Sequence, residues 1–446
     1  MPFPLPNVGP ANQPFQFALI PQSGATPAKL FLKNTTAAYV YDGTTVTEVT
    51  DADYPATTVW GVVYLDGTIY VMDVAGVIYG SDLNNPLSWD ALNFITANAD
   101  GDAAVALARH LNYIVAFKDR TTEFLFDAGA AAPGSPLGKM QNAFMEIGCA
   151  TSGSIASSDN SVYFMSKSNA KGRSISKMEG FTPRKISTPF IDRILNGDDL
   201  ATVRSFVVKL NGHVFYVLTL VTSEITLVFD EVTNEWHRWS SMTRGSIVNV
   251  TGTTTTDGVA TIPSTSHGLQ DGDPILLLGE ILPISYIDAD TFSVVASGAV
   301  PANTSYYPYS ESYFIGMYYA HAAGEDLVLT LDGAAIYQFS TSTYQDNGMP
   351  IDVRVRTAVE DFGEMRLKTF RRLELVGDIE DTTVNLRWTD DDYQTWSIFR
   401  PIPVDVNRAQ LRMLGAARRR AFEMRHLDNT PLRKIAIELD IDVGAR

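Results

Sequence analysis

The most specific grouping of chemistry-bearing side chains in this 446-residue sequence lies near its C-terminal end. Thr389, Asp391, Thr395 and Trp396 follow the Asp-box spacing S-x-D-x-G-x-T-W, with Thr in place of Ser and Tyr393 in place of Gly. In such a box the Asp accepts backbone N–H groups of a hairpin turn, and the Trp packs beneath it. The box is familiar from propeller glycosidases, which need two carboxylates at a set separation. A sialidase would also need a converging arginine triad, an acid and a Tyr/Glu nucleophile pair. Because none of these stands out in the sequence, we interpret the box as structural.

The histidines and the single cysteine do not suggest a second site. His267 has no other His within metal-ligand spacing, so we interpret it as part of a turn. Cys149 lies in the apolar stretch EIGCA, which favours a buried position over a nucleophile, and one cysteine allows no internal disulfide. The sequence has no Gly-rich phosphate loop, no G-x-S-x-G elbow and no zinc-type spacing. We therefore expect no enzyme activity, no catalytic or metal-binding residue and no cofactor.

A basic cluster follows the Asp-box. Its members are Arg408, Arg412, Arg418, Arg419, Arg420 and Arg425. They form either an interface with an acidic partner or neighbouring subunit, or a solvated strand edge. Residues 351–446 contain 17 basic and 17 acidic residues, so the net charge of −17 arises in the first 350 residues. Such an acidic region argues against static DNA binding, which depends on Lys and Arg, but suits a channel wall past which DNA slides.

The elements that position these residues are predicted from a loose internal repeat of strand, polar turn and returning strand. The turns lie at residues 65–67 (LDG), 111–112 (LN), 158–160 (SDN) and 210–212 (LNG). Their spacing of roughly 45 to 52 residues is typical of small stacked sheets. A further copy at residues 323–326 (AGED) comes late by about 65 residues, which indicates one inserted domain. The repeat predicts a β-propeller with an axial channel, which we expect acidic side chains to line.

The sequence therefore predicts an all-β protein with a β-propeller-like core. The predicted parts are an N-terminal arm (1–15), propeller blades (16–246), an inserted small β-barrel of five or six strands (247–310), the continued propeller (311–349) and a C-terminal β domain or closing blade (350–446). One helix is predicted at residues 188–200, with Thr188 as its N-cap. There is no apolar run of about 18 residues and no secretion signal at the start, so we expect no membrane-spanning segment and assembly in a cytosol.

Several stretches resemble the tail hub or nozzle proteins of short-tailed bacteriophages, also called packaged-DNA stabilisation proteins. They are 81–89 (SDLNNPLSW), 122–129 (TEFLFDAG), 146–150 (EIGCA), 184–189 (RKISTP), 229–237 (FDEVTNEWH) and 387–392 (RWTDDD). The likeness spans about residues 60–239 and 318–446, and leaves out the insert. It implies a hexamer below the tail adaptor ring, which narrows the DNA exit channel after packaging and opens for ejection. It also implies a tail fibre or spike, and in some members a needle, as neighbours.

The resemblance places the protein in the virion, after assembly in a bacterial cytoplasm, and implies no catalytic residues. A different class of function remains open from the residues alone. The Asp-box and the aromatic content also fit a carbohydrate-binding or glycosidase propeller that acts on a host surface glycan. A generic protein-interaction propeller fits the repeat but not the stretches quoted above.

Overall fold

The structure is a computed structural model that describes residues 15–22, 27–130, 133–141, 143–158, 160–168, 172–314, 316–322, 324–330 and 335–444, apart from the side chain of Ile435. The predicted arm lies outside these residues except for Phe15, as do Asp159 and Ala323 of two predicted turns. The described chain is mostly β, with one short α-helix. It divides into two compact units, the first from Met1–Arg238 and Gly316–Tyr337, the second from Trp239–Ile315 and Gln338–Arg446.

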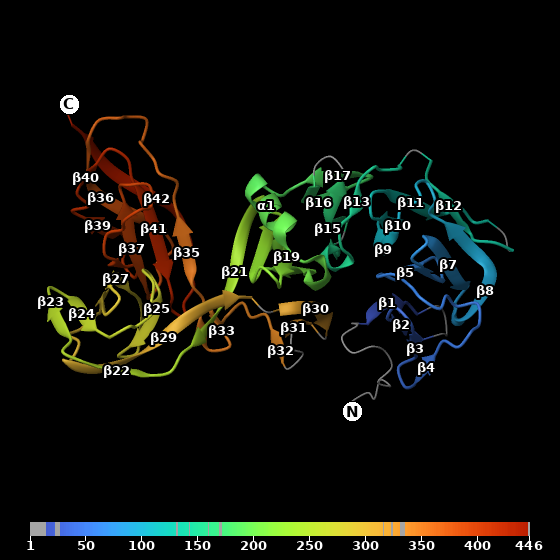
Figure 1. The fold of residues 1–446 in the computed structure, drawn as a ribbon, viewed down its shortest axis with the longest axis horizontal. Coiled ribbons are helices and arrows are strands. Elements are labelled where there is room, and N and C mark those ends of the chain that lie inside the picture. Colours follow the sequence, from blue (N-terminus) through green and yellow to red (C-terminus); the bar gives the residue numbers. More distant parts are fainter. Residues whose placement is uncertain are drawn as a thin grey trace. The chain divides into compact units, whose positions relative to one another are not determined.

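The described part of the first unit contains six antiparallel sheets, which in Figure 1 succeed one another around a common centre from blue to orange. The first three consist of β1 (Gln16–Ile20), β2 (Lys29–Lys33), β3 (Ala38–Tyr41) and β4 (Val46–Glu48); β5 (Val63–Leu65), β6 (Thr68–Met72), β7 (Val77–Asp82) and β8 (Asn85–Thr96); and β9 (Ala104–His110), β10 (Tyr113–Lys118), β11 (Thr122–Asp127) and β12 (Leu137–Lys139). The next three consist of β13 (Gly148–Cys149), β14 (Ala156–Ser158), β15 (Ser161–Ser168), β16 (Gly172–Glu179) and β17 (Thr182–Lys185); β18 (Arg204–Leu210), β19 (His213–Leu220), β20 (Ile225–Asp230) and β21 (Glu235–Arg244); and β30 (Gly316–Ala322), β31 (Glu325–Thr330) and β32 (Ile336–Gln338).

Three of the predicted polar turns join the first two strands of their sheets. Asp66, Leu111 and Asn211 adopt left-handed backbone φ values of 46°, 55° and 50° at the β5–β6, β9–β10 and β18–β19 turns. Tight hairpin turns favour such φ values, because a turn built from them twists in the same sense as the strands that it joins. The turn prediction is confirmed at these three positions.

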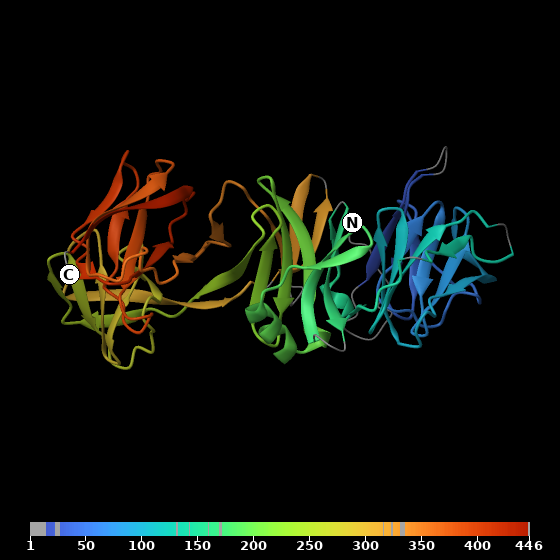
Figure 2. The same ribbon diagram turned by 90° about the horizontal axis from the view of Figure 1, so that it is seen from above.

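Apolar side chains fill the space between successive sheets, as expected when each sheet has one face to bury. Ring pairs that join neighbouring sheets are Phe31–Trp89 (centroids 6.4 Å apart), Phe117–Phe164 (4.9 Å), Tyr163–Tyr216 (4.9 Å) and Phe206–Tyr319 (5.8 Å). Met72 and Ile114, both fully buried, share the core between the second and third sheets. Figure 2 shows the orange β30–β32 sheet beside the green β18–β21 sheet. The sheets therefore form an unbroken series of packed contacts.

One glycine marks a close approach between neighbouring sheets. Gly61 has a φ of +97°, and a Cβ placed on it would lie 1.8 Å from the backbone oxygen of Leu107. The adjacent Trp60 carbonyl accepts a hydrogen bond from the Leu107 N–H at 2.8 Å. Only a residue without a side chain fits here, because both the φ and the space exclude a Cβ.

The predicted helix is present as α1 (Pro189–Gly197), followed by the 3₁₀ turn η2 (Leu200–Thr202); a second such turn is η1 (Ser152–Ser154). Thr188 caps the helix by accepting the Ile191 N–H on its side chain. Ile191 and Leu195 are buried, and α1 packs against β16. The capping prediction is confirmed.

The inserted segment of the second unit has its own core. Its strands are β22 (Val248–Thr251), β23 (Thr254–Thr256), β24 (Val259–Pro263), β25 (Pro274–Leu277), β26 (Glu280–Pro283), β27 (Ser285–Asp288), β28 (Thr291–Val295) and β29 (Asn303–Tyr313). One sheet has the order β23-β24-β28-β27, and β29 pairs with β21, β22 and β25. The described insert thus has eight strands, and the expected five or six was too few. The exposed strand Thr254–Thr256 explains part of the difference, because a polar edge strand leaves no apolar signal in the sequence.

The rest of the second unit is a two-stranded sheet, β33-β34, and a pair of larger sheets around another core. Its strands are β33 (Gln345–Asp346), β34 (Met349–Pro350), β35 (Val353–Arg356), β36 (Lys368–Gly377), β37 (Thr383–Thr389), β38 (Arg400–Pro403), β39 (Ala409–Arg412), β40 (Ala416–Ala417), β41 (Ala421–His426) and β42 (Lys434–Val443). One sheet has the order β35-β41-β37-β38, and in the other β36 pairs with β39, β40 and β42. Phe370, Leu373 and Leu386 are fully buried between them. Arg387, Arg420 and Arg425 are also buried here, which is rare for arginine unless it is paired.

Candidate functional site

The predicted Asp-box forms the turn between β37 and β38. Asp391 accepts the backbone N–H groups of Gln394 and Thr395 on Oδ1, at 3.1 and 2.9 Å. The hydroxyls of Thr389 and Thr395 donate to the same carboxylate at 2.8 and 2.5 Å. These hydrogen bonds, that of the Thr395 hydroxyl first, lower the pKa of Asp391 to about 2. The carboxylate of Asp391 thus accepts four hydrogen bonds from its own turn and stabilises that turn.

The Trp of the box lies next to buried arginine. The guanidinium carbon of Arg387 is 4.6 Å from the centre of the Trp396 ring and 4.3 Å from that of Phe399. Arg356 also lies over Trp396, at 5.4 Å. Cation–π contacts of this kind are strongest when water is excluded. The box therefore supports a charged cluster instead of a ligand cleft.

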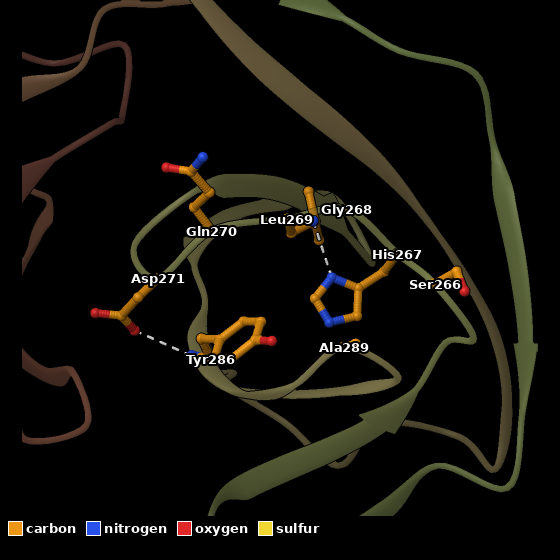
Figure 3. A pocket seen from close by; sticks show the side chains of 8 residues that line it. All are labelled: Ser266, His267, Gly268, Leu269, Gln270, Asp271, Tyr286 and Ala289. Carbon is orange, nitrogen blue, oxygen red and sulfur yellow. Dashed lines mark hydrogen bonds between the residues drawn. The ribbon is translucent and has the colours of Figure 1, made fainter.

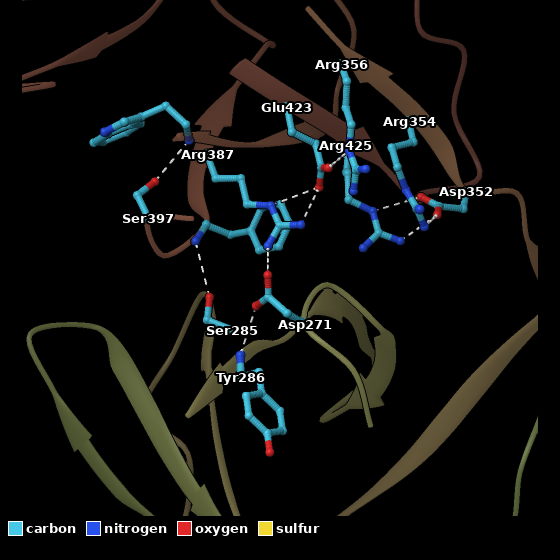
Figure 4. A network of polar contacts seen from close by, with 12 residues as sticks. Asp271, Ser285, Tyr286, Asp352, Arg354, Arg356, Arg387, Ser397, Glu423 and Arg425 are labelled. Carbon is cyan, nitrogen blue, oxygen red and sulfur yellow. Dashed lines mark hydrogen bonds and ion pairs between the residues drawn. The ribbon is translucent and has the colours of Figure 1, made fainter. Parts of the chain in front are cut away.

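That cluster is centred on an ion pair between β37 and β41, shown in Figure 4. Arg387 and Glu423 lie 2.9 Å apart, with side chains 2% and 0% exposed. Arg356 binds the other carboxylate oxygen of Glu423, and Arg387 also binds Asp271 of the insert. Burial, the largest influence, lowers the pKa of Arg387, while Glu423 and Asp271 oppose the shift. The arrangement is a hydrogen-bonded charge network within the second unit, with the buried Arg387–Glu423 pair at its centre and the more exposed Arg356 and Asp271 at its edge.

A second buried pair lies beside the first. Arg425 donates to Asp352 at 3.0 and 2.5 Å, and Arg354 donates to the same carboxylate at 2.6 Å. A Cβ on Gly272 of the insert would lie 2.9 Å from Arg425 Nη1 and 3.2 Å from Arg387 Nη2. The loop 271–273 of the insert therefore lies directly against both guanidinium groups.

The predicted basic cluster divides into buried and exposed members. Arg425 and Arg420 are each 1% exposed, and Arg420 binds Asp390 at 2.7 and 2.8 Å. Arg425 binds the buried Asp352, and Arg420 binds Asp390, whose side chain is 40% exposed. Neither arginine itself lies on a surface that a partner could reach, so the prediction needs correcting for them. The sequence missed this because the carboxylates that pair with them are 30 and 73 residues away.

The other four predicted arginines are exposed. Arg408 pairs with Glu374 at 2.8 Å and Arg419 pairs with Asp392. Arg412 makes a long hydrogen bond of 3.4 Å to Gln410, whereas Arg418 makes no ion pair with the described part of the chain. Sequence reasoning did not select Arg387, Glu423 or Asp271. The period-two pattern of β37 places Arg387 on the face of the strand opposite to its apolar side chains. Only the fold shows that the insert covers this face.

The turn at His267 borders a surface cavity of about 540 Å³ on the insert, drawn in Figure 3. The Leu269 N–H donates to His267 Nδ1 at 2.9 Å, which places the ring proton on Nε2, and Nε2 donates to the Asp288 carbonyl at 2.9 Å. Both ring nitrogens thus fasten the turn, as predicted. Within the described ranges no three His, Cys, Asp or Glu side chains are placed to hold a metal ion.

Cys149 is fully buried in the first unit, and burial raises the pKa of its thiol to about 12. Its Sγ lies 3.2 Å from the Thr151 carbonyl oxygen. A thiol so far from ionisation at neutral pH is a poor nucleophile, which confirms the structural interpretation.

The first unit has a cavity of about 1040 Å³ at the centre of its sheets, which we call the axial cavity. Residues of β1, β9, β14, β18 and β30, and the segment before β5, contribute to its wall. Its described wall carries one charged side chain, Arg109, and no carboxylate. The acidic lining that we expected for the propeller axis is therefore wrong. The innermost strands line this cavity with aromatic, apolar and uncharged polar side chains.

Comparisons with known proteins point to a phage family. Residues 22–254 match the family model Phage_stabilise, described as bacteriophage P22 Gp10, beta-propeller. No curated protein matches. Similar solved structures include BamB from Moraxella catarrhalis (10% identity, 73% of this chain and 96% of that chain, TM-score 0.31) and BBS1N in complex with ARL6DN (12% identity, 72% and 89%, TM-score 0.33). At these TM-scores the structural likeness carries no argument. No helix in the described ranges is long and apolar enough to cross a membrane.

Proposed function

The chain belongs to the phage stabilisation family of β-propellers described as bacteriophage P22 Gp10, and from this premise we propose that it is the nozzle or hub of a short-tailed phage tail. In this role it extends the DNA exit channel below the adaptor ring, closes the channel after packaging and opens it for ejection. The proposed form is a hexamer in the virion, assembled in the bacterial cytoplasm. Its proposed neighbours are the adaptor ring, a tail fibre or spike and, where the tail has one, a needle or tip protein.

The observation that carries the proposal is the position of the family match. Residues 22–254 include β2 to β21, so they cover nearly all of the first five sheets. The match therefore applies to the series of packed sheets itself. The family is one of phage structural proteins, which implies a role without enzymatic chemistry. A stiff body of this kind suits a part that must keep its shape under the pressure of packaged DNA.

The charge distribution supports a wall that DNA passes without binding. The net charge of −17 lies in the first 350 residues, and repulsion between carboxylates and phosphates opposes adhesion. Because the described part of the axial cavity's wall carries no carboxylate, we assign this repulsion to the outer surface of the propeller, which would face the DNA in a ring of subunits.

We further propose that the insert (247–310) and the C-terminal β domain (350–446) act as one module, since the charge network joins them. The exposed arginines Arg408, Arg412, Arg418 and Arg419 form the proposed contact surface toward the adaptor or a neighbouring subunit. Arginine is enriched at interfaces, and Arg418 has no carboxylate partner within the described chain.

A phage that carries an early stop codon in this gene tests the proposal. Grown in a non-suppressing host, it should package DNA and then lose it, so that the capsid DNA becomes sensitive to nuclease. Expression of the full chain from a plasmid should restore nuclease-resistant particles. Particles that keep their DNA without this chain would contradict the proposal. If such particles failed only to adsorb to host polysaccharide, the carbohydrate-binding or glycosidase alternative would replace it, although the Asp-box carboxylate no longer supports that alternative.

A further inference from the structure

The sheet around β36 carries opposite charges at its two edges. Residues 372–375 of β36 pair both with β39 and with β42, so these two strands lie on opposite sides of it. The face of this sheet that turns away from the core carries Arg412 on β39, and it carries Glu438, Asp440 and Asp442 on β42. All four residues are exposed. We call the β39 side the basic edge and the β42 side the acidic edge.

The register of this sheet places like charges opposite each other near both edges. Arg412 lies opposite Arg372 of β36, and Glu438 lies opposite Glu374 of the same strand. Like charges in directly opposite positions are destabilising. Among the described residues, neither Arg412 nor Asp440 forms an ion pair. A second copy that set its acidic edge against the basic edge would supply the missing opposite charges.

The charges favour a head-to-tail contact over a symmetric one. Among the described strands, β42 pairs with β36 alone, so its other side is an open edge. Two copies of β42 placed side by side would bring Glu438 and Asp440 against their own equivalents, and charged side chains on an edge strand commonly prevent such pairing. A contact between unlike edges brings opposite charges together instead. Repeated head-to-tail contacts of this kind close into rings.

The contact at the basic edge must be made by side chains. Arg400 of β38 donates to the Arg412 carbonyl at 2.9 Å and to the Met413 carbonyl at 3.1 Å, so these carbonyls are not free to pair with an added strand. The Arg412 guanidinium itself makes one long hydrogen bond of 3.4 Å, to Gln410. Because a guanidinium has five N–H donors, Arg412 can still bind a carboxylate of another chain.

We propose that the acidic edge of one copy, through Glu438 and Asp440, binds Arg412 at the basic edge of a second copy of this chain. Because this contact presupposes the proposed ring of copies, it rests on the proposed function. It names the partner of the basic edge as the neighbouring subunit and not the adaptor.

Exchange of the two charges tests the contact. Plasmids that encode Arg412→Glu, Asp440→Arg or both changes complement the phage with the early stop codon, and quantitative mass spectrometry measures how much of the chain purified particles contain. Each single change should lower incorporation about threefold or more, since it sets like charges against each other at every contact. The exchanged variant should return to within about twofold of the wild type, because each contact regains opposite charges. The matched control Arg412→Glu/Asp381→Arg should stay low, since Asp381 is exposed in the turn between β36 and β37.

The exchange leaves the balance of charges within one sheet unchanged. Arg372 lies opposite both positions, so it keeps one like and one opposite neighbour. The unfolding midpoint of each variant should therefore stay within about 2 °C of the wild type. An exchanged variant that is incorporated no better than Arg412→Glu would overturn the contact, as would normal incorporation of either single variant. The tail function is tested separately, by whether particles without this chain keep their DNA.

Cross-linking gives a second readout with smaller changes. Particles assembled from a mixture of Arg412→Cys and Asp440→Cys chains are treated with a short bismaleimide, and linked peptides are identified by mass spectrometry. The native Cys149 is fully buried, so it should not react. Links between positions 412 and 440 should form, whereas a mixture of Arg193→Cys and Asp440→Cys chains should give none, because Arg193 is exposed on α1 of the other unit. Particles that contain both chains and lack the 412–440 link would overturn the contact.

Discussion

Arg387 of β37 and Glu423 of β41 form an ion pair that is buried on both sides, with 2.9 Å between Nη2 and Oε1. The same guanidinium binds Asp271 from the insert and lies against two aromatic rings. A buried charge of this kind stabilises a fold only if its partners are all present, because an unpaired charge in the interior is very unfavourable. The pair therefore links the insert to the C-terminal sheets and makes both depend on it.

Replacing Arg387 by Met should destabilise the protein strongly. The change leaves Glu423 buried with Arg356 as its remaining partner, and loss of one member of a buried pair costs about 3 to 5 kcal/mol. We expect the free energy of unfolding to fall by an amount near the lower end of this range. Urea denaturation measures it from the transition in which the second unit unfolds. Arg408→Met is the control, because Arg408 is 59% exposed and its pair contributes less than about 1 kcal/mol. Equal effects of the two substitutions would contradict a special role for the buried pair.

Gly61→Ala should prevent or severely weaken the packing of the second sheet on the third. The new Cβ would lie 1.8 Å from Leu107 O, and the φ of +97° is itself strained for Ala. We expect a loss of more than about 3 kcal/mol or no folded protein, judged by thermal unfolding and soluble yield. Gly43→Ala is the matched control, with a φ of +100° and no atom within 4 Å, and should lose only about 1 kcal/mol from strain. A stable Gly61→Ala protein would show that the two sheets do not meet as described.

Lys33 should give the protein a distinctive dependence of stability on pH. Its ammonium is buried, with hydrogen bonds at 2.8 Å to the Val59 carbonyl and 3.0 Å to the Thr58 hydroxyl, and burial lowers its pKa from 10.5 to about 7. Between pH 7 and 10.5 the unfolded chain binds this proton and the folded chain does not, so its contribution to the free energy of unfolding rises with pH. Below pH 7 both states are protonated, and the penalty stays constant.

The difference in stability between Lys33→Met and the wild type measures this effect. As the pH falls from 10.5 to 7, the free energy of unfolding of the variant should rise relative to that of the wild type. The total rise should be several kcal/mol, since one pKa unit is about 1.4 kcal/mol. Guanidinium denaturation of both proteins at four pH values gives the difference directly. A difference that does not change with pH would mean that Lys33 keeps an ordinary pKa in the folded protein.

Reversing the charge of the exposed arginines should impair assembly but not folding. In Arg412→Glu/Arg418→Glu both side chains are exposed and neither takes part in an ion pair within the described chain, so the unfolding midpoint should stay within about 2 °C. Incorporation of the chain into phage particles should fall at least tenfold, as measured by quantitative mass spectrometry of purified virions. Arg193→Glu on the exposed side of α1 serves as the control and should be incorporated normally. Normal incorporation of the double variant would exclude this surface as a tail contact.

The parts of the fold that the sequence predicted are those fixed by local chemistry. Asp66, Leu111 and Asn211 stand at turns that need a left-handed residue, and Thr188 caps the one α-helix described, so each is visible within a few residues of chain. Alternation of apolar and polar residues predicts a strand, but it does not say what covers the polar face of that strand. The burial of Arg387 depends on Asp271, which lies 116 residues away. No short-range pattern contains that pairing.

The same limit explains the errors in the predicted site. Arg420 and Arg425 carry the same charge as Arg418 and Arg419, and the sequence placed all four on one surface. The structure separates them, because the side chains of Arg420 and Arg425 point inward to Asp390 and Asp352, whereas those of Arg418 and Arg419 are exposed. The expectation that acidic side chains line the propeller axis was wrong, because net charge is a property of the whole region and does not say which side chains face the centre.

A cryo-EM reconstruction of the tail of a phage that encodes this chain tests the central claim most directly. Our account predicts six copies in a closed ring below the adaptor, with the propellers around the DNA exit channel and Arg412 and Arg418 at a contact with the adaptor or a neighbouring subunit. A particle in which this chain is absent from the channel, or occurs as single copies on the outer surface away from the tail axis, would contradict it.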